Sequence, residues 1–201
     1  MLFKMYHRPN FGKQLLLTFL ITCSQWIWSC KPQEKNDSFE ANRSYESVDK
    51  NFKNIATNSD LTIIYLRAHD VELRKECKVL RKENGQWSKL SFHISFQNVL
   101  TKVNETTLSE TEGSNLFHRL TNHHIFDIIP EEALLEEHNK LCGKPYDPSH
   151  FLEFNLILVS GENVRELHFS NPSGRFEMCP AIKQWDNAAK ISDLFEKEWV
   201  N

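Results

Sequence analysis

Histidine is the residue type with the most obvious capacity for chemistry, because nine histidines occur in the chain of 201 residues. Three of them lie close together, His118, His123 and His124. A zinc site needs three or four ligands, and two histidines one helical turn apart are its usual signature. The step from His118 to His123 is longer than that turn, and histidines at a helix C-terminus also complement its carbonyls. We therefore predict no metal site and no cofactor, and keep these three histidines as the residues to test.

Other catalytic patterns are absent or have a simpler interpretation. The chain has no Gly-x-Ser-x-Gly turn and no cysteine signature of a known nucleophile. A triad of distant residues, or a site shared by His138, His150 and His168, would leave no trace in the sequence. Four glutamates could supply paired carboxylates for acid–base chemistry: Glu131, Glu132, Glu136 and Glu137. At helical spacing such glutamates more often form a solvated helix face, so no catalytic residue is assigned.

Two further sets of side chains could bind a ligand. Residues 74–82 are locally basic and could contact an acidic polymer, although Glu72, Glu76 and Glu83 dilute the charge. Three tryptophans could form a platform for stacking sugars: Trp87, Trp185 and Trp199. Lysines on edge strands also discourage unwanted pairing, and aromatic residues at helical spacing are usually core. Neither set is assigned as a site.

The N-terminal residues have the pattern of an export signal. Lys4, Arg8 and Lys13 precede the apolar run 15–21, and no acidic residue occurs before position 30. A basic flank, a short apolar core and a small residue define a cleavable signal peptide. A membrane-spanning helix needs roughly 20 apolar residues, and Gln25 interrupts the stretch from Leu15 to Ser29. A buried N-terminal helix is the remaining structural interpretation.

The sequence Ile27-Trp28-Ser29-Cys30 resembles the bacterial lipobox. The resemblance implies cleavage before Cys30, lipidation of its sulfur with acyl chains such as palmitate, and attachment to a membrane of the bacterial envelope on the periplasmic or outer-membrane side. Trp28 departs from the pattern, in which this position usually holds a smaller residue. A competing motif, Leu20-Ile21-Thr22-Cys23, would place the cut before Cys23. A eukaryotic secretory signal is a further alternative, since residues 42–44 and 104–106 form glycosylation sequons.

Charge and composition limit the partners and define the layout. Removing residues 1–29 leaves 21 Lys and Arg against 27 Asp and Glu, a formal charge of about −6. An acidic chain is a poor match for nucleic acid, whose affinity comes largely from phosphate neutralisation. The low hydrophobicity after Cys30 predicts a flexible tether over about residues 31–51. We therefore expect a signal peptide at 1–29, the lipidated cysteine and tether at 30–59, and one domain at 60–201.

Alternating and helical patterns predict an α+β domain built on an antiparallel sheet of hairpins, with two or three short helices. Strands are expected at 61–66, 76–81, 90–96, 151–159 and 163–170, with turns at Asn84-Gly85 and Ser160-Gly161-Glu162. A helix should begin after Ser109, where Glu112 completes a capping box, and another at Pro130. An amphipathic helix closes the chain after a loop over 171–180.

The predicted hairpin of residues 151–170 places two cysteines near each other. Cys142 precedes its first strand and Cys179 follows its second, so both lie at the open end of the hairpin. Because an exported protein meets an oxidising compartment, we predict a disulfide between Cys142 and Cys179. The alternative is that these two residues and Cys77 are reduced thiols.

The order of elements from Leu108 to about Trp199 resembles an uncharacterised domain of small bacterial lipoproteins. The matching parts are Leu116-Phe117-His118-Arg119-Leu120, Ile129-Pro130, Asp147 with Glu153, Asn171-Pro172 and the last helix. The resemblance implies a fold and a location, but no activity. We therefore expect a non-enzymatic envelope module that binds a protein or another envelope component. The alternative is a hydrolase or metal-dependent enzyme, which metal analysis of variants at His123 and His124 would reveal.

Overall fold

The computed structural model describes residues 43–44, 49–68, 75–95, 97, 99–144 and 152–199. The chain divides into two units, Met1–Asp37 and Ser38–Asn201, and every described residue belongs to the second. The predicted signal peptide, both lipobox cysteines and most of the predicted tether therefore lie outside the described residues. Within the described part, no helix is both long enough and apolar enough to cross a bilayer.

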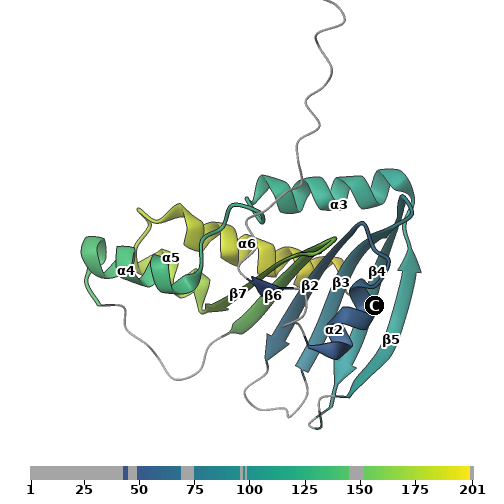
Figure 1. Ribbon diagram of the computed structural model, residues 1–201. Coiled ribbons are helices and arrows are strands. Elements are labelled where there is room, and N and C mark those ends of the chain that lie inside the picture. The colour runs from purple at the N-terminus through teal and green to yellow at the C-terminus, as the bar shows by residue number, and fades with distance from the viewer. Residues whose placement is uncertain are drawn as a thin grey trace, which may run out of the picture. The chain divides into compact units, whose positions relative to one another are not determined.

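A seven-stranded antiparallel sheet forms the centre of the second unit (Figure 1). Its spatial order is β1-β7-β6-β2-β3-β4-β5, so that β2 joins two hairpin systems that are distant in the chain. The strands are β1 (Arg43–Ser44), β2 (Leu61–Ala68), β3 (Lys75–Glu83), β4 (Gln86–Ile94), β5 (Leu100–Thr107), β6 (Glu153–Ser160) and β7 (Asn163–Ser170). The predicted α+β class and its antiparallel hairpins are confirmed.

Two tight turns set the register of the hairpins. Asn84 and Gly85 both have positive φ, 49° and 77°, as the two-residue turn between β3 and β4 requires. Gly161 has φ 57° in the turn between β6 and β7. Both turns occur where the sequence predicts them. The register then follows, with Lys78 opposite Ser91 and Leu156 opposite Leu167.

Five helices are described: α2 (Lys50–Ala56), α3 (Glu110–Asn122), α4 (Glu131–Cys142), α5 (Pro172–Met178) and α6 (Lys183–Glu198). The predicted capping box of α3 is present, since the Ser109 hydroxyl accepts from the Glu112 N–H and Glu112 accepts from the Ser109 N–H. Gly143 follows α4 with φ 82°, a conformation that suits glycine.

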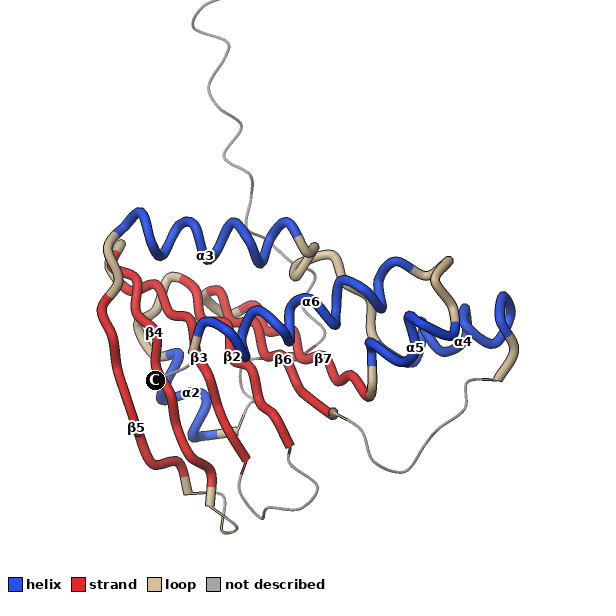
Figure 2. The backbone as a smooth tube through the Cα atoms, turned by 180° about the vertical axis from the view of Figure 1, so that it is seen from behind, coloured by secondary structure: helices blue, strands red, loops and turns tan. Residues whose placement is uncertain are grey.

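The two faces of the sheet bury separate cores. On one face α6 contributes Trp185, Ile191 and Phe195 to a large cluster that also contains residues of α3 and α4. On the other face α2 contributes Ile55 and Ala56 to a smaller cluster. Figures 1 and 2, which view the molecule from opposite sides, show α2 on one face of the sheet and α3 and α6 on the other.

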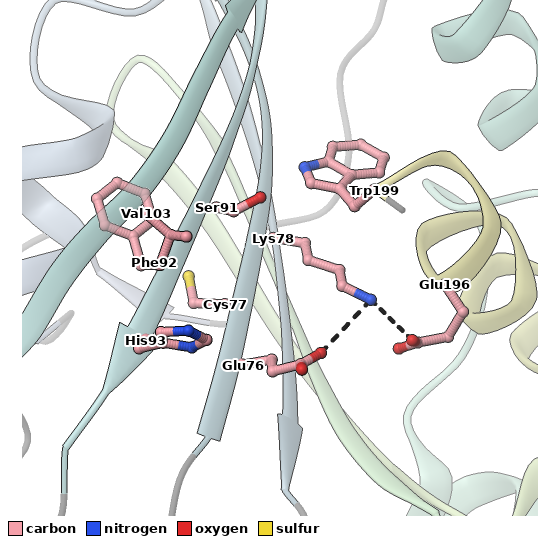
Figure 3. A pocket seen from close by; sticks show the side chains of 9 residues that line it. All are labelled: Glu76, Cys77, Lys78, Ser91, Phe92, His93, Val103, Glu196 and Trp199. Atoms are coloured by element: carbon pink, nitrogen blue, oxygen red, sulfur yellow. Dashed lines mark hydrogen bonds and ion pairs between the residues drawn. The ribbon is translucent and has the colours of Figure 1, made fainter. Parts of the chain in front are cut away.

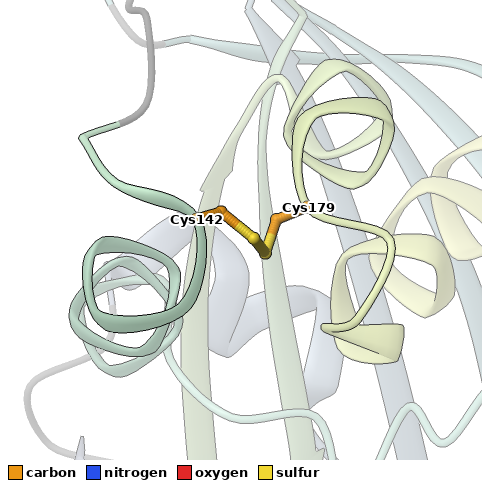
Figure 4. Close-up of a disulfide and its surroundings, with 2 residues drawn as sticks. All are labelled: Cys142 and Cys179. Atoms are coloured by element: carbon orange, nitrogen blue, oxygen red, sulfur yellow. A yellow bond between two sulfur atoms is a disulfide. The ribbon is translucent and has the colours of Figure 1, made fainter.

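The disulfide between Cys142 and Cys179 is present, as predicted (Figure 4). Cys142 is the last residue of α4 and Cys179 directly follows α5, and their Cα atoms lie 5.8 Å apart. The bond therefore links the ends of two helices, through cysteines that are 37 residues apart in the sequence. Cys77 is the remaining described cysteine, and it is a fully buried free thiol in β3.

Three elements differ from the sequence prediction. Helix α2 lies within the predicted tether, and because Ile55 and Ala56 are buried, the folded part begins before the predicted boundary at residue 60. Strand β5 was not predicted, because most of its residues are polar and exposed. The predicted loop over 171–180 contains α5, which begins where the Asn171 side chain accepts from the Gly174 N–H and proline occupies the first turn.

Candidate functional site

A groove of about 250 Å³ opens beside the last turn of α6, on the face of the sheet that this helix covers (Figure 3). We call it the sheet groove. Its walls come from β3, β4, β5 and α6, and nine residues line it: Glu76, Cys77, Lys78, Ser91, Phe92, His93, Val103, Glu196 and Trp199. It is therefore assembled from elements that are far apart in sequence.

Strand alternation brings the polar side chains of the sheet groove to one face. Glu76 and Lys78 are two residues apart in β3, and their partners in β4 are His93 and Ser91. Because directly opposed residues share a face, all four side chains project on the side of α6. Val103 joins them from β5, where the pairing with β4 shifts between Ser91 and Phe92.

The charges in and around the sheet groove are matched. Glu196 accepts from Lys78 at 2.7 Å and contacts Arg67 at 3.0 Å, while Lys78 also lies 3.6 Å from Glu76. Burial by itself would raise the pKa of Glu196, but the Lys78 hydrogen bond and the charges of Lys78 and Arg67 outweigh it and lower that pKa. Two carboxylates thus face two cations, so the groove has no excess charge to attract an ionic ligand.

Tyr65 of β2 is close to Glu196 and Arg67 of this charge network. Its ring packs against Phe195, with centroids 5.0 Å apart. Its hydroxyl hydrogen-bonds the Ser192 hydroxyl at 2.8 Å. Burial raises the pKa of Tyr65 well above its ordinary value, so the phenol stays protonated at neutral pH. Tyr65 therefore acts as a packed, hydrogen-bonded support for α6.

The sheet groove lacks the arrangement of an activated nucleophile. A catalytic serine or cysteine needs a base within hydrogen-bond reach. Among the described residues, no hydroxyl or thiol hydrogen-bonds a histidine side chain, and Cys77 is fully buried. Burial also raises the pKa of the Cys77 thiol to about 12. The groove can hold a polar ligand, but its side chains are not set up to attack one.

A second polar cluster lies where α4 meets β7 and α5. Glu131 accepts from the Ser170 N–H at 3.0 Å and from its hydroxyl at 2.6 Å, and lies 3.4 Å from Arg175. Glu131 is buried, unlike Glu132, Glu136 and Glu137, so its predicted place on a solvated helix face is wrong. We call Glu131, Ser170 and Arg175 the Glu131 cluster. Arg175 also donates to the Ser170 carbonyl, so the cluster joins three elements.

The three candidate metal ligands occupy the end of α3 and the turn after it. His118 is exposed, His123 caps the helix through its backbone N–H, and His124 has φ 58°. Burial, followed by the charge of Lys190, lowers the pKa of His123. Throughout the described residues, no group of three or more His, Cys, Asp or Glu side chains is placed to hold a metal ion. The structure thus gives these histidines no shared site.

The other histidines are also separate. His138 is 1% exposed and packs its ring at 6.5 Å from that of Trp185, with its Nδ1 unpartnered. His168 lies at the surface, 2.8 Å from Asn155 and 3.8 Å from Glu131. His150 falls outside the described residues. The structure does not bring the described pair together as a site.

The tryptophans and the basic segment also have structural roles. Trp87, Trp185 and Trp199 are all buried in the larger core, so they form no stacking platform. Three of the four cations that are described in the basic segment have a partner. They pair as Lys78 with Glu196, Arg81 with Glu83 and Glu105, and Lys82 with the ring of Trp87.

Sequence reasoning missed the sheet groove and the Glu131 cluster. A signal for the cluster was present, because Asn171-Pro172 marks the start of α5 and so positions Arg175 on its first full turn. The groove had no comparable signal, since its residues become neighbours only through the sheet register. No protein family and no curated protein matches the chain.

Proposed function

We propose that this chain is a lipid-anchored binding protein of a bacterial cell envelope. Residues 1–29 direct export, Cys30 carries the acyl chains, and the α+β domain binds a protein or another envelope component without catalysing a reaction. The membrane is its partner through the anchor. The resemblance of residues 27–30 to a lipobox and of residues 108–199 to a small lipoprotein domain supports this assignment.

The Cys142–Cys179 disulfide is the observation that carries the proposal. Disulfides persist in exported proteins and are rare in a reducing cytoplasm. This bond joins the end of α4 to the end of α5, and the remaining described cysteine is buried and unable to exchange readily with it. A disulfide between two structural elements is typical of a protein that matures in an oxidising compartment.

The sheet groove supports binding as the role of the domain. Its charges are internally matched, it offers the polar side chains of Ser91 and His93, and it lies on a rigid sheet rather than on a loop. Such a surface can hydrogen-bond a neutral polar group of a partner. Among the described residues, no histidine side chain hydrogen-bonds a hydroxyl or thiol, and the Ser91 hydroxyl of the groove has no carboxylate partner, which favours binding over hydrolysis.

Labelling of the producing cells with palmitate tests the anchor. The Cys30→Ser variant should lose the label and leave the membrane fraction, because the acyl acceptor is gone. The Cys23→Ser variant is the matched control and should stay labelled, because the proposal removes Cys23 with the signal peptide. The reverse result would support cleavage before Cys23, and a wild-type protein without label would overturn the proposal.

A further inference from the structure

The two edges of the sheet differ in how they are covered. At one edge, β1 pairs with Asn163 and Val164 of β7, and Glu131 of α4 accepts the N–H of Ser170 farther along the same strand. At the other edge, β5 is exposed from Thr101 to Thr107 and pairs only with β4 among the described residues. An uncovered edge strand of this length is a ready template for another strand.

Strand β5 has two features that usually blunt an edge, a bulge and a lysine. Neither makes this edge repulsive. The Lys102 ammonium is 2.5 Å from the Glu105 carboxylate, so its charge is already matched on the same face of the strand. The residue at the bulge, Val103, is 47% exposed, and Val99 beside the strand is 54% exposed. The edge therefore combines a balanced charge pair with exposed apolar surface.

The sequence of β5 is complementary to itself in the antiparallel direction. A two-fold axis between Val103 and Asn104 sets Lys102 of each copy opposite Glu105 of the other copy. The same register pairs Thr101 with Thr106, a favourable cross-strand combination. We propose that two copies of this chain pair through β5 and form one continuous antiparallel sheet.

The four charged side chains would then alternate in sign on one face of the joined strands. On the opposite face, Val103 of each copy would lie opposite Asn104 of the other, with the two exposed valines diagonal to each other across the axis. That face also carries the sheet groove, which Val103 lines in each copy. Because a two-fold axis between antiparallel strands runs perpendicular to the sheet, the two grooves would open on the same side of the dimer. Pairing through β5 does not require the lipid anchor.

Sedimentation equilibrium of the full-length protein, as its own cells produce it and in density-matched detergent, tests the dimer. The wild type should sediment as a dimer. Lys102→Glu and Glu105→Lys should each raise the dimer dissociation constant by about tenfold or more, because each turns two attractive cross-strand pairs into repulsive ones. The double variant Lys102→Glu/Glu105→Lys should restore the dimer, because the reversed pairs are again complementary.

Two controls separate this interface from other effects. Lys190→Glu reverses one member of an exposed pair with Asp186 on α6 and should leave the dimer intact. The circular dichroism spectrum of each β5 variant should match that of the wild type, since an exposed ion pair adds little to the stability of the fold. A monomeric wild type, a dimer that survives Lys102→Glu, or a double variant that stays monomeric would each overturn the proposal.

Discussion

Glu131 and Arg175 form a buried ion pair that joins α4 to α5, with side chains only 8% and 6% exposed. Replacing Glu131 with alanine leaves the guanidinium buried without its carboxylate and removes the acceptor of two Ser170 bonds. Breaking a buried pair from one side costs about 3 kcal/mol. We therefore expect Glu131→Ala to lower the free energy of unfolding by about that amount, as measured by urea denaturation.

Glu132 provides the matched control for this change. It is the next residue in the first turn of α4, and it is exposed. Glu132→Ala should cost only a few tenths of a kcal/mol, the typical contribution of an exposed acid at a helix N-terminus. If both variants lost the same free energy of unfolding, the burial of Glu131 would not explain its contribution to stability.

We expect His138 to make the stability of the domain depend on pH. Burial, followed by the charge of Arg175, lowers the pKa of His138 below its ordinary value of 6.5. Below pH 6.5 the imidazole is protonated in the unfolded chain before it is protonated in the folded protein. The contribution of His138 to the free energy of unfolding is therefore complete above pH 6.5 and is lost as the pH falls. We expect the free energy of unfolding to drop between about pH 7 and about pH 5.

The variant His138→Phe removes this titrating group and keeps an aromatic ring beside Trp185. It should lose less stability than the wild type over the same pH range. Some dependence should remain, because the pKa of His123 is lowered in the same direction. Urea denaturation at each pH measures the difference, and parallel curves for the two proteins would rule out His138 as a source of the dependence.

At the scale of secondary structure, Gly113 shows how packing overrides helix propensity. It lies inside α3, where alanine would normally be favoured by about 1 kcal/mol. A Cβ atom at this position would collide with the Trp87 side chain, which is 2% exposed and held in the core. Gly113→Ala should therefore destabilise the domain by about 1–3 kcal/mol, because the tryptophan must move.

Asn115 is the comparison position for this prediction, since it is exposed in the same helix. Asn115→Ala should be neutral or slightly stabilising, because nothing obstructs the new side chain and alanine has the higher helix propensity. Thermal unfolding of both variants measures the contrast. A stabilised Gly113→Ala protein would show that α3 is free to move away from Trp87.

The elements that sequence reasoning found are those with strong local signals. The Asn84-Gly85 turn, the capping box at Ser109 and the apolar periodicity of α6 each indicate one structure, and the protein adopts it. Strand β2 was also clear, because a strand buried on both faces is continuously apolar. Local chemistry and tertiary packing agree at these positions.

The missed elements lack such agreement. Strand β5 is an edge strand exposed along nearly its whole length, so it shows no alternation of apolar and polar residues. Helix α2 has only seven residues, and its place depends on the burial of Ile55 and Ala56 against the sheet. The sheet groove needs the register of three strands and the end of α6, which no local pattern encodes. Tertiary contacts determine all three features.

At the scale of the whole molecule, the disulfide holds the helical side of the domain together. It closes a loop with a sequence separation of 37 residues that includes β6 and β7. Restricting the unfolded chain by a loop of this size contributes about 4 kcal/mol. Replacing Cys142 and Cys179 with serine should lower the free energy of unfolding by about that amount.

Reductant gives an internal check on the disulfide. It should destabilise the wild-type protein and leave the doubly substituted protein unchanged, because the buried Cys77 thiol has no partner to lose. The measurement is urea denaturation with and without dithiothreitol. A wild-type protein that is indifferent to reductant would remove the main support for maturation in an oxidising compartment.

The location of the molecule is the claim on which its proposed role depends, because an anchor determines which partners it can meet. Mass spectrometry of the N-terminal peptide, from protein isolated from the cells that make it, tests that claim most directly. We expect a chain that begins at Cys30 with acyl groups attached to this residue. A chain that begins at Met1, or an unmodified Cys30, would contradict it.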